Sequence, residues 1–228
     1  DDRLLAVLPG IPQEMKGIFR AALRPRLDAQ ADLQEVLHRT LVTSGIGESS
    51  LQERLGDLDS VLDAHTHLAY LPSTSGVRLR LTATTNGEPD AETRLDRLEA
   101  HIRERASEHV IGEGEVTLEE VLGDQLRGAG RTIASAESAT GGLIGHRLTG
   151  VSGSSDYYVG SVVAYANHVK QQVLGVDADV IQTDGAVSEA VAVQMAEGVR
   201  RVLDTDVGIA TTGIAGPTGG TPEKPAGT

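Results

Sequence analysis

Residues 111–228 alternate amphipathic helix patterns with short apolar strand patterns, and this alternation restricts the fold more than any other feature of the chain. Helix patterns cover residues 117–127, 140–148, 167–174 and 188–203, and strand patterns cover residues 132–136, 159–164 and 207–211. Strands joined through helices pair in parallel, because each helix carries the chain back across the sheet. We therefore predict an α/β fold here, a layered α/β domain with a largely parallel sheet.

Residues 33–110 follow a different order: strand, helix, strand, strand, helix. The expected strands are residues 33–41, 67–71 and 76–85, and the expected helices begin at residues 45–48 and 90. In the third strand Val77, Leu79 and Leu81 alternate with Arg78 and Arg80, which predicts one buried and one wet face. This order indicates a small two-layer α+β domain preceding the α/β domain.

Residues 1–32 contain one strand pattern, residues 3–8, and one helix pattern, residues 14–27. One strand and one helix cannot bury their apolar faces alone, so we interpret this part as the last unit of a domain whose body is missing. The chain also starts without Met and stops inside a glycine-rich segment, residues 225–228. We expect it to be a piece of a longer protein, divided into residues 1–32, 33–110 and 111–228.

The charge of the chain argues against a nucleic-acid partner. The formal net charge is −13; residues 1–32 hold five acids and five bases, residues 33–110 thirteen and eight (−5), and residues 111–228 fifteen and seven (−8). No part is basic, as a phosphate-backbone footprint would require. No apolar run approaches the roughly 18 to 20 residues of a membrane span, and there is no cysteine. We expect a cytoplasmic protein with no membrane partner.

Two histidines, His65 and His67, have a spacing that is compatible with a metal on a strand. No Asp, Glu or Cys motif converges with them, so we favour ordinary strand-edge histidines and predict no metal site.

Glu137 has two possible roles: an acid/base beside Ser138, or a buried, hydrogen-bonded structural carboxylate.

Polar or glycine-rich segments follow three of the expected strands, where ligands sit in open α/β sheets. Ser138 lies between a strand and a helix N-terminus, whose free N–H groups can hold an oxyanion. A serine nucleophile needs a base, and the second segment offers Lys170 and His168. Lys170 needs a lowered pKa to act, and Tyr165 can orient or relay the proton. Ser138 Oγ and Lys170 Nζ should then lie roughly 2.6 to 5 Å apart.

Each of these residues also has an ordinary structural interpretation. Ser138 or Thr140 can be a helix cap, Tyr165 a strand-end tyrosine and Lys170 a solvated helix lysine. The glycine-rich segment can be a plain loop, and it lacks the Gly-Lys-Ser/Thr of a phosphate loop.

A resemblance to a known family favours the chemical interpretation. Residues 136–142, Ala-Glu-Ser-Ala-Thr-Gly-Gly, resemble the Ala-Glu-Ser-Cys-Thr-Gly-Gly motif of the CinA C-terminal family. Five further segments resemble signatures of that family in the same order: residues 152–155, 165–170, 185–189, 212–217 and 219–228. Ala139 replaces the family's cysteine, and we expect this change to affect packing only.

The resemblance implies a nicotinamide-nucleotide amidohydrolase, which converts nicotinamide mononucleotide to nicotinic acid mononucleotide and ammonia without a cofactor. It implies Ser138 as nucleophile, Lys170 as general base and Tyr165 as its partner. We expect the nucleotide to be bound by seven residues of the same segments: Thr140, Gly141, Gly142, Asn167, Thr212, Gly213 and Gly216.

The resemblance extends upstream. Residues 8–15 are similar to the end of the family's molybdopterin-cofactor-binding-like domain, whose pyrophosphatase activity this chain should lack, and residues 33–110 resemble its KH-type middle domain. The latter lacks the Gly-x-x-Gly loop of RNA-binding KH domains, which favours a spacer or dimerisation module and a homodimer. The resemblance also implies that the deamidase domain is truncated at Thr228. The alternative function is a non-catalytic scaffold for assembly or competence.

Overall fold

The computed structural model describes residues 4–30, 36–73, 76–85 and 90–228. The chain divides into two compact units, Asp1–Gly114 and Glu115–Thr228, and each is described by itself. The boundary that we expected after residue 110 falls inside a strand, β4 (Val110–Glu113), which pairs with the sheet of the first unit. The division therefore follows Gly114, while the boundary expected at 32/33 lies outside the described residues.

The N-terminal segment of the first unit is helical. It consists of α1 (Pro12–Ile18), a π-helix η1 (Phe19–Leu23) and α2 (Arg24–Gln30), where one helix over residues 14–27 was expected. The strand expected at residues 3–8 is wrong: residues 4–8 have no regular structure and Leu5 and Val7 are exposed. A strand needs a neighbour for its backbone groups, and no described strand pairs with this segment.

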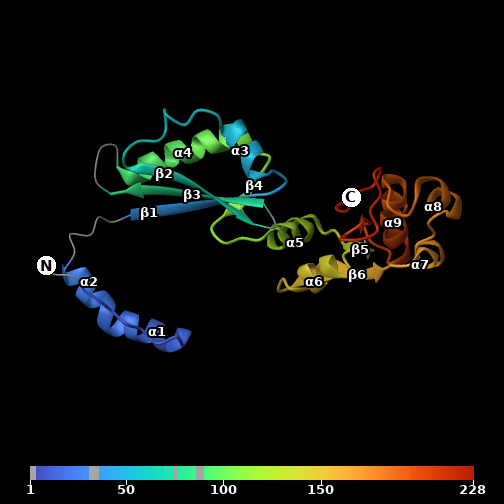
Figure 1. Cartoon of the computed structure of the whole chain (residues 1–228), viewed down its shortest axis with the longest axis horizontal. Helices are drawn as coiled ribbons and strands as arrows, with labels where there is room; N and C mark the ends of the chain where they lie inside the picture. The colour runs from blue at the N-terminus through green and yellow to red at the C-terminus, as the bar shows by residue number, and fades with distance from the viewer. Residues whose placement is uncertain (1–3, 31–35, 74–75, 86–89) are drawn as a thin grey trace. The chain divides into compact units, whose positions relative to one another are not determined.

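The rest of the first unit is a four-stranded antiparallel sheet with helices on one face (Figure 1). Its order is β2-β3-β1-β4, with β1 (Val36–Thr43), β2 (Thr66–Ser73) and β3 (Gly76–Thr84). Its helices are α3 (Glu48–Leu55) and α4 (Ala91–Ala106). The predicted two-layer α+β domain is confirmed, although β4 was missed because four residues carry too little periodicity.

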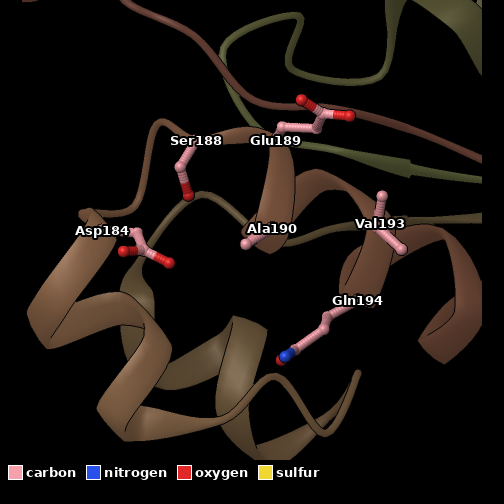
Figure 2. A pocket seen from close by; sticks show the side chains of 6 residues that line it. All are labelled: Asp184, Ser188, Glu189, Ala190, Val193 and Gln194. Atoms are coloured by element: carbon pink, nitrogen blue, oxygen red, sulfur yellow. The ribbon is translucent and has the colours of Figure 1, made fainter.

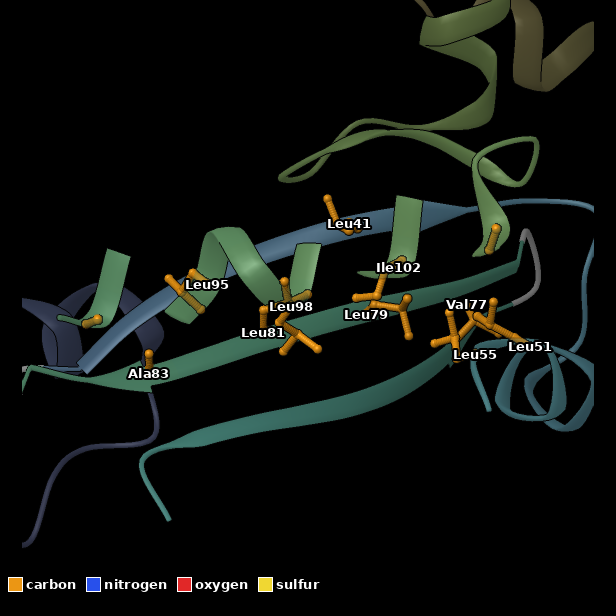
Figure 3. Packing of buried hydrophobic residues seen from close by; sticks show 12 residues of the cluster. Leu41, Leu51, Leu55, Val77, Leu79, Leu81, Ala83, Leu95, Leu98 and Ile102 are labelled. Atoms are coloured by element: carbon orange, nitrogen blue, oxygen red, sulfur yellow. The ribbon is translucent and has the colours of Figure 1, made fainter. Parts of the chain in front are cut away.

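The core of this unit lies between the sheet and its helices, as Figure 3 shows. Val77, Leu79 and Leu81 of β3 are fully or almost fully buried, while Arg80 on the opposite face is exposed. Leu98 and Ile102 of α4 pack onto the same face and are 0% exposed. The period-2 alternation in the sequence thus assigned the two faces of β3 correctly.

The second unit contains a parallel three-stranded sheet of order β6-β5-β7, which confirms the predicted α/β fold. Its strands are β5 (Ile133–Glu137), β6 (Tyr158–Val163) and β7 (Val207–Thr211). Its helices are α5 (Leu118–Ala129), α6 (Leu143–Thr149), α7 (Asn167–Gln172), α8 (Ala178–Asp184) and α9 (Glu189–Val202), with a short 3-10 turn η2 (Ser154–Asp156). All five residues of β5 are buried, as expected for the central strand.

The ends of two helices in this unit follow signals that the sequence provides. Thr117 and Glu120 form the expected capping box at the start of α5, and Gly130 ends this helix in a left-handed conformation. Ser188 caps α9 by accepting a hydrogen bond from the Val191 amide. In the described part of the chain, no helix is long and apolar enough to cross a membrane.

Candidate active site

The three parallel strands end at one edge of the sheet, and the candidate residues follow directly. Ser138 comes one residue after β5, Tyr165 two residues after β6, and Thr212 one residue after β7. The Ser138 amide donates to Thr211 O at 3.1 Å, which ties the end of the central strand to that of β7. The expected convergence at the carboxyl ends of the strands is present.

A direct hydrogen bond joins the candidate nucleophile and base. Lys170 Nζ donates to Ser138 Oγ at 3.1 Å, inside the distance range expected from the sequence. The same nitrogen donates to Ala164 O at 2.8 Å and to Tyr165 O at 3.0 Å. Lys170 is 1% exposed and Ser138 is 7% exposed. The structure therefore places Lys170 inside the unit, and the interpretation as a solvated helix lysine is wrong.

Burial lowers the pKa of Lys170 below that of a free lysine, because the charged ammonium loses its hydration. Among the described residues, no carboxylate forms an ion pair with Lys170 that would oppose this effect. The protonated amine uses its three N–H donors on two carbonyls and one hydroxyl. The neutral amine can keep both carbonyl bonds and direct its lone pair at the Ser138 hydroxyl proton. This is the hydrogen-bond arrangement that a general base for Ser138 requires.

The serine–lysine pair opens onto a cavity of about 390 Å³. Strand-end segments and the α8–α9 connection line it: Ser138, Ala139, Tyr165, Asn167, Lys170, Ala186, Val187, residues 212–216, Thr218 and Gly219. Six of the expected site residues besides Ser138 thus lie together around one space, namely Tyr165, Asn167, Lys170, Thr212, Gly213 and Gly216.

Tyr165 lies at the cavity with its side chain 75% exposed. Its backbone carbonyl, and not its hydroxyl, is the group that contacts Lys170. Within the described residues, no hydrogen bond of the Tyr165 hydroxyl is found, so this hydroxyl is open to a ligand at the cavity. A proton relay between Ser138 and Lys170 does not need Tyr165, because the two side chains meet directly.

Thr140, Gly141 and Gly142 were expected to bind substrate, but the cavity lining does not include them. Thr140 Oγ1 donates to Glu137 Oε2 at 2.8 Å, and the Gly142 amide donates to the same oxygen at 3.1 Å. Gly141 forms the turn between them with a φ of +62°. Thr140 and Gly142 thus bind Glu137, whereas Ala139 of the same turn lines the cavity.

Glu137 is fully buried and accepts hydrogen bonds from three hydroxyls and three backbone amides: those of Ser135, Thr140 and Ser161, and of Gly142, Ile144 and Gly145. Burial by itself raises the pKa of Glu137, but the hydrogen bonds from Gly145, Ile144 and the hydroxyls outweigh it and leave the pKa below its usual range. Of the two interpretations given above, the structural carboxylate fits this environment.

The backbone amide that follows Ser138 is open to a ligand at the cavity. No acceptor is found within the described residues for the backbone amides of Ala139 and Thr140, and Ala139 lines the cavity. The first free amides after a strand can stabilise an oxyanion, as the sequence position of Ser138 suggested.

Ala186 and Val187 belong to the cavity wall, although we assigned no role to them from the sequence. They lie in the connection between α8 and α9, and α8 itself was not predicted. Thr212 Oγ1 donates to Ala186 O at 2.7 Å, which joins this connection to the segment after β7. The sequence feature that could have identified them is the motif at residues 185–189, but nothing in the sequence indicated which segment this motif would contact.

A second and larger cavity, of about 640 Å³, lies between the end of α8 and the start of α9 (Figure 2). It contains neither Ser138 nor Lys170 and is lined by Asp184, Ser188, Glu189, Ala190, Val193 and Gln194. None of its lining residues is buried, and its one hydroxyl, Ser188, already donates to Gly185 O and accepts from the Val191 amide, so we place the chemistry in the smaller cavity.

No cluster of three or more His, Cys, Asp or Glu side chains that could hold a metal occurs in the described part of the chain. His65 lies in the turn just before β2, with its Nδ1 3.2 Å from Thr84 Oγ1, while His67 belongs to the strand itself.

Fold and site together define a class of protein in which a KH-type unit precedes a parallel α/β unit with a buried serine–lysine pair. Residues 115–228 match the model of the CinA C-terminal domain, and residues 38–112 match that of the damage-inducible protein CinA KH domain. The chain belongs to the CinA family.

Its relatives include a CinA-like protein of Salinibacter ruber, 68% identical over 100% of this chain and 55% of the relative. A CinA-like protein of Gemmatimonas aurantiaca is 45% identical over 99% of this chain and 53% of the relative. The chain thus spans about half the length of the curated relatives that it matches. Among solved structures, the competence/damage inducible protein CihA from Agrobacterium tumefaciens is 40% identical, with a TM-score of 0.46 over 48% of this chain and 67% of that one.

Proposed function

We propose that the second unit hydrolyses the amide of nicotinamide mononucleotide to nicotinic acid mononucleotide and ammonia. The observation that carries this proposal is the buried Lys170, whose Nζ lies 3.1 Å from Ser138 Oγ without a counter-ion in the described residues. A serine with a neutral lysine as its base can attack an amide carbonyl. The resemblance of the surrounding motifs to the CinA C-terminal family selects the substrate.

The reaction proceeds through an acyl-enzyme. Neutral Lys170 takes the Ser138 proton while Oγ attacks the carboxamide carbon, and the tetrahedral intermediate carries an oxyanion. Collapse of this intermediate breaks the C–N bond, and Lys170 returns the proton to the leaving nitrogen, which departs as ammonia. Water then attacks the ester with Lys170 again as base, and the carboxylate product and free Ser138 result.

The oxyanion requires donors that are in place before the reaction starts. The Ala139 amide supports this assignment, because it follows the nucleophile, lines the cavity and has no acceptor in the described residues. Tyr165, Asn167, Thr212, Gly213 and Gly216, which line the same cavity, then hold the nucleotide around the carboxamide. No cofactor is needed for the chemistry.

The alternative, a non-catalytic scaffold, does not account for Lys170. An ammonium group that is 1% exposed and lacks an ion-pair partner in the described residues destabilises a fold. An assembly module gains nothing from such a residue, whereas a general base depends on the lowered pKa that burial produces. The predicted homodimer and the cytoplasmic location remain proposals alongside the activity.

Ammonia release from nicotinamide mononucleotide by the full-length protein tests the proposal. Ser138→Ala should abolish turnover, whereas Ser152→Ala, which removes an exposed hydroxyl from the same unit, should leave it unchanged. Free nicotinamide should be a poorer substrate in kcat/KM, because binding of the remote phosphate and ribose helps to orient the amide. Full activity of Ser138→Ala, or no ammonia from the wild-type protein, would refute the proposal.

A further inference from the structure

Lys224 is the other lysine of the second unit whose amine contacts backbone carbonyls, and the proposed mechanism does not use it. It lies in a turn in which its own backbone amide donates to Thr221 Oγ1 at 3.1 Å and its carbonyl accepts from the Thr221 amide at 2.8 Å. The turn orients its half-buried side chain toward the connection between α8 and α9.

The Lys224 amine fits into the curve of this connection. Nζ donates to Asp184 O at 2.5 Å and to Val187 O at 2.7 Å. Asp184 ends α8, where a cation satisfies a free carbonyl and interacts favourably with the helix dipole. Between the two carbonyls, Gly185 has a φ of +80°, and a Cβ at this position would lie 3.1 Å from Lys224 Nζ. The glycine therefore allows both the turn and the close approach of the amine.

A second hydrogen bond from outside the connection also holds it in place. Thr212 Oγ1 donates to Ala186 O. The carbonyls on either side of it accept from the Ser188 hydroxyl and from Lys224, respectively. Ala186 and Val187 line the cavity that contains Ser138, whereas Lys224 does not. Through its hydrogen bond to Val187 O, Lys224 can influence the cavity by the position of this wall.

The ends of the connection border the larger cavity. Figure 2 shows the side chains of Asp184 and Ser188 directed into this space of about 640 Å³. A segment with open space on one side is positioned mainly by its contacts on the other. Those contacts include two charge-assisted hydrogen bonds from one amine.

We propose that Lys224 is a positioning residue that fixes the Ala186–Val187 wall of the cavity against the glycine-rich segment, and so sets the affinity for the nucleotide. The catalytic part of this inference rests on the proposed deamidation. The structural part, that Lys224 holds the α8–α9 connection closed, stands independently of any activity.

Lys224→Met tests both parts in the full-length protein, because methionine keeps most of the side chain's length and removes the charge and the donors. We expect KM for nicotinamide mononucleotide to rise about tenfold while kcat changes by less than about threefold, the pattern of lost binding. The pH dependence of kcat should stay as in the wild type, since Ser138 and Lys170 are untouched. Lys224→Arg, which retains a charged donor, should recover most of the affinity.

Limited proteolysis supplies the readout that does not need turnover. An acid-specific protease should cleave after Asp184 and Glu189 about tenfold faster in Lys224→Met, because opening of the connection becomes more frequent. Glu223→Gln is the matched control: it changes an exposed neighbour in the same turn and should leave KM and both cleavage rates unchanged. Circular dichroism shows whether each variant is folded.

The outcomes separate the two proposals. Wild-type cleavage rates together with a wild-type KM in folded Lys224→Met would overturn the role of Lys224. A wild-type protein that releases no ammonia would refute the deamidase, whereas the cleavage rates would still decide whether Lys224 holds the connection. If Lys224→Met does not fold, the same comparison is made with Lys224→Gln, which keeps a neutral donor and should show an intermediate cleavage rate.

Discussion

Lys170 Nζ lies 3.1 Å from Ser138 Oγ, although 32 positions separate the two residues in the chain. The parallel pairing of β5 and β6 explains this contact, because both strands end at the same edge of the sheet. Ser138 follows the end of β5, and Lys170 lies in the short helix that follows β6. Two carbonyls after β6 then direct the amine toward the serine and away from solvent.

Lys170→Arg should lose on the order of 100-fold or more in kcat, the usual scale for a lost general base. Arginine keeps the positive charge and can donate to the same carbonyls, but its guanidinium does not lose a proton at any relevant pH. Steady-state ammonia release, with circular dichroism and a thermal melt to establish folding, measures the effect. Lys170→Met should be similarly inactive and serves as a second variant if arginine does not fit the buried position.

His168 provides the matched control for Lys170, because it lies in the same helix and was the alternative base. The structure leaves His168 exposed and outside the cavity lining. His168→Gln should therefore retain turnover within about twofold, the range expected for a group that does not contact the reacting atoms. Near-wild-type kcat in Lys170→Arg, combined with a large loss in His168→Gln, would exchange the two roles.

The pH dependence of kcat/KM should follow deprotonation of Lys170. Only the neutral amine can accept the Ser138 proton, so activity should fall about tenfold per pH unit below the pKa of Lys170 and reach a plateau above it. Burial lowers this pKa, so the midpoint should lie below the value of about 10.4 for a free lysine. Rates between about pH 6 and pH 10 locate the midpoint.

The pH dependence of the residual activity in Lys170→Met shows whether the fall in kcat/KM at low pH belongs to Lys170. Removal of the base should abolish this fall, while His168→Gln should keep it at the same midpoint. An unchanged fall in Lys170→Met would assign the titration to another group and contradict the role of Lys170.

The sequence pattern was sufficient for the parallel sheet, whereas the choice of Lys170 over His168 as the base came from the family resemblance. Alternation of helices and strands predicts parallel strands, and parallel strands bring Ser138 and Lys170 to one edge whatever the details of packing. The prediction of a strand at residues 3–8 was wrong, because an apolar run does not reveal whether another strand is present to pair with it. The short elements α8 and β4 were missed since seven and four residues leave little periodicity.

The roles of individual side chains were harder to predict. A hydroxyl at a helix start, such as Thr140, looks the same in sequence whether it faces a ligand or a carboxylate, and here it donates to Glu137. The exposure of the Tyr165 side chain depends on how the chain leaves β6, which no local pattern fixes. Ala186 and Val187 line the cavity and accept hydrogen bonds from Thr212 and Lys224, tertiary contacts that no local pattern reveals.

Glu137→Gln should destabilise the second unit by about 3 kcal/mol at pH 7, since a buried group with several charge-assisted bonds loses them together. The carboxylate accepts from six donors, whereas the amide of glutamine has one acceptor oxygen and would turn its NH2 group toward other donors. Urea unfolding, followed by circular dichroism, gives the free energy of unfolding of both proteins. Glu197→Gln, on an exposed face of α9, should change it by less than about 0.5 kcal/mol.

The difference in the free energy of unfolding between the wild type and Glu137→Gln should change with pH in a defined direction. The pKa of Glu137 is lower in the folded than in the unfolded chain, so the native state binds fewer protons and the carboxylate contributes its full stability above the unfolded value of about 4.3. As the pH falls through that value and then through the folded pKa, this stability is lost. The gap between the wild type and Glu137→Gln should therefore be widest near pH 7 and narrow below about pH 4. A gap that stays constant from about pH 7 to pH 3 would show that Glu137 is not held ionised by its donors, and the turn that places Ser138 would need another explanation.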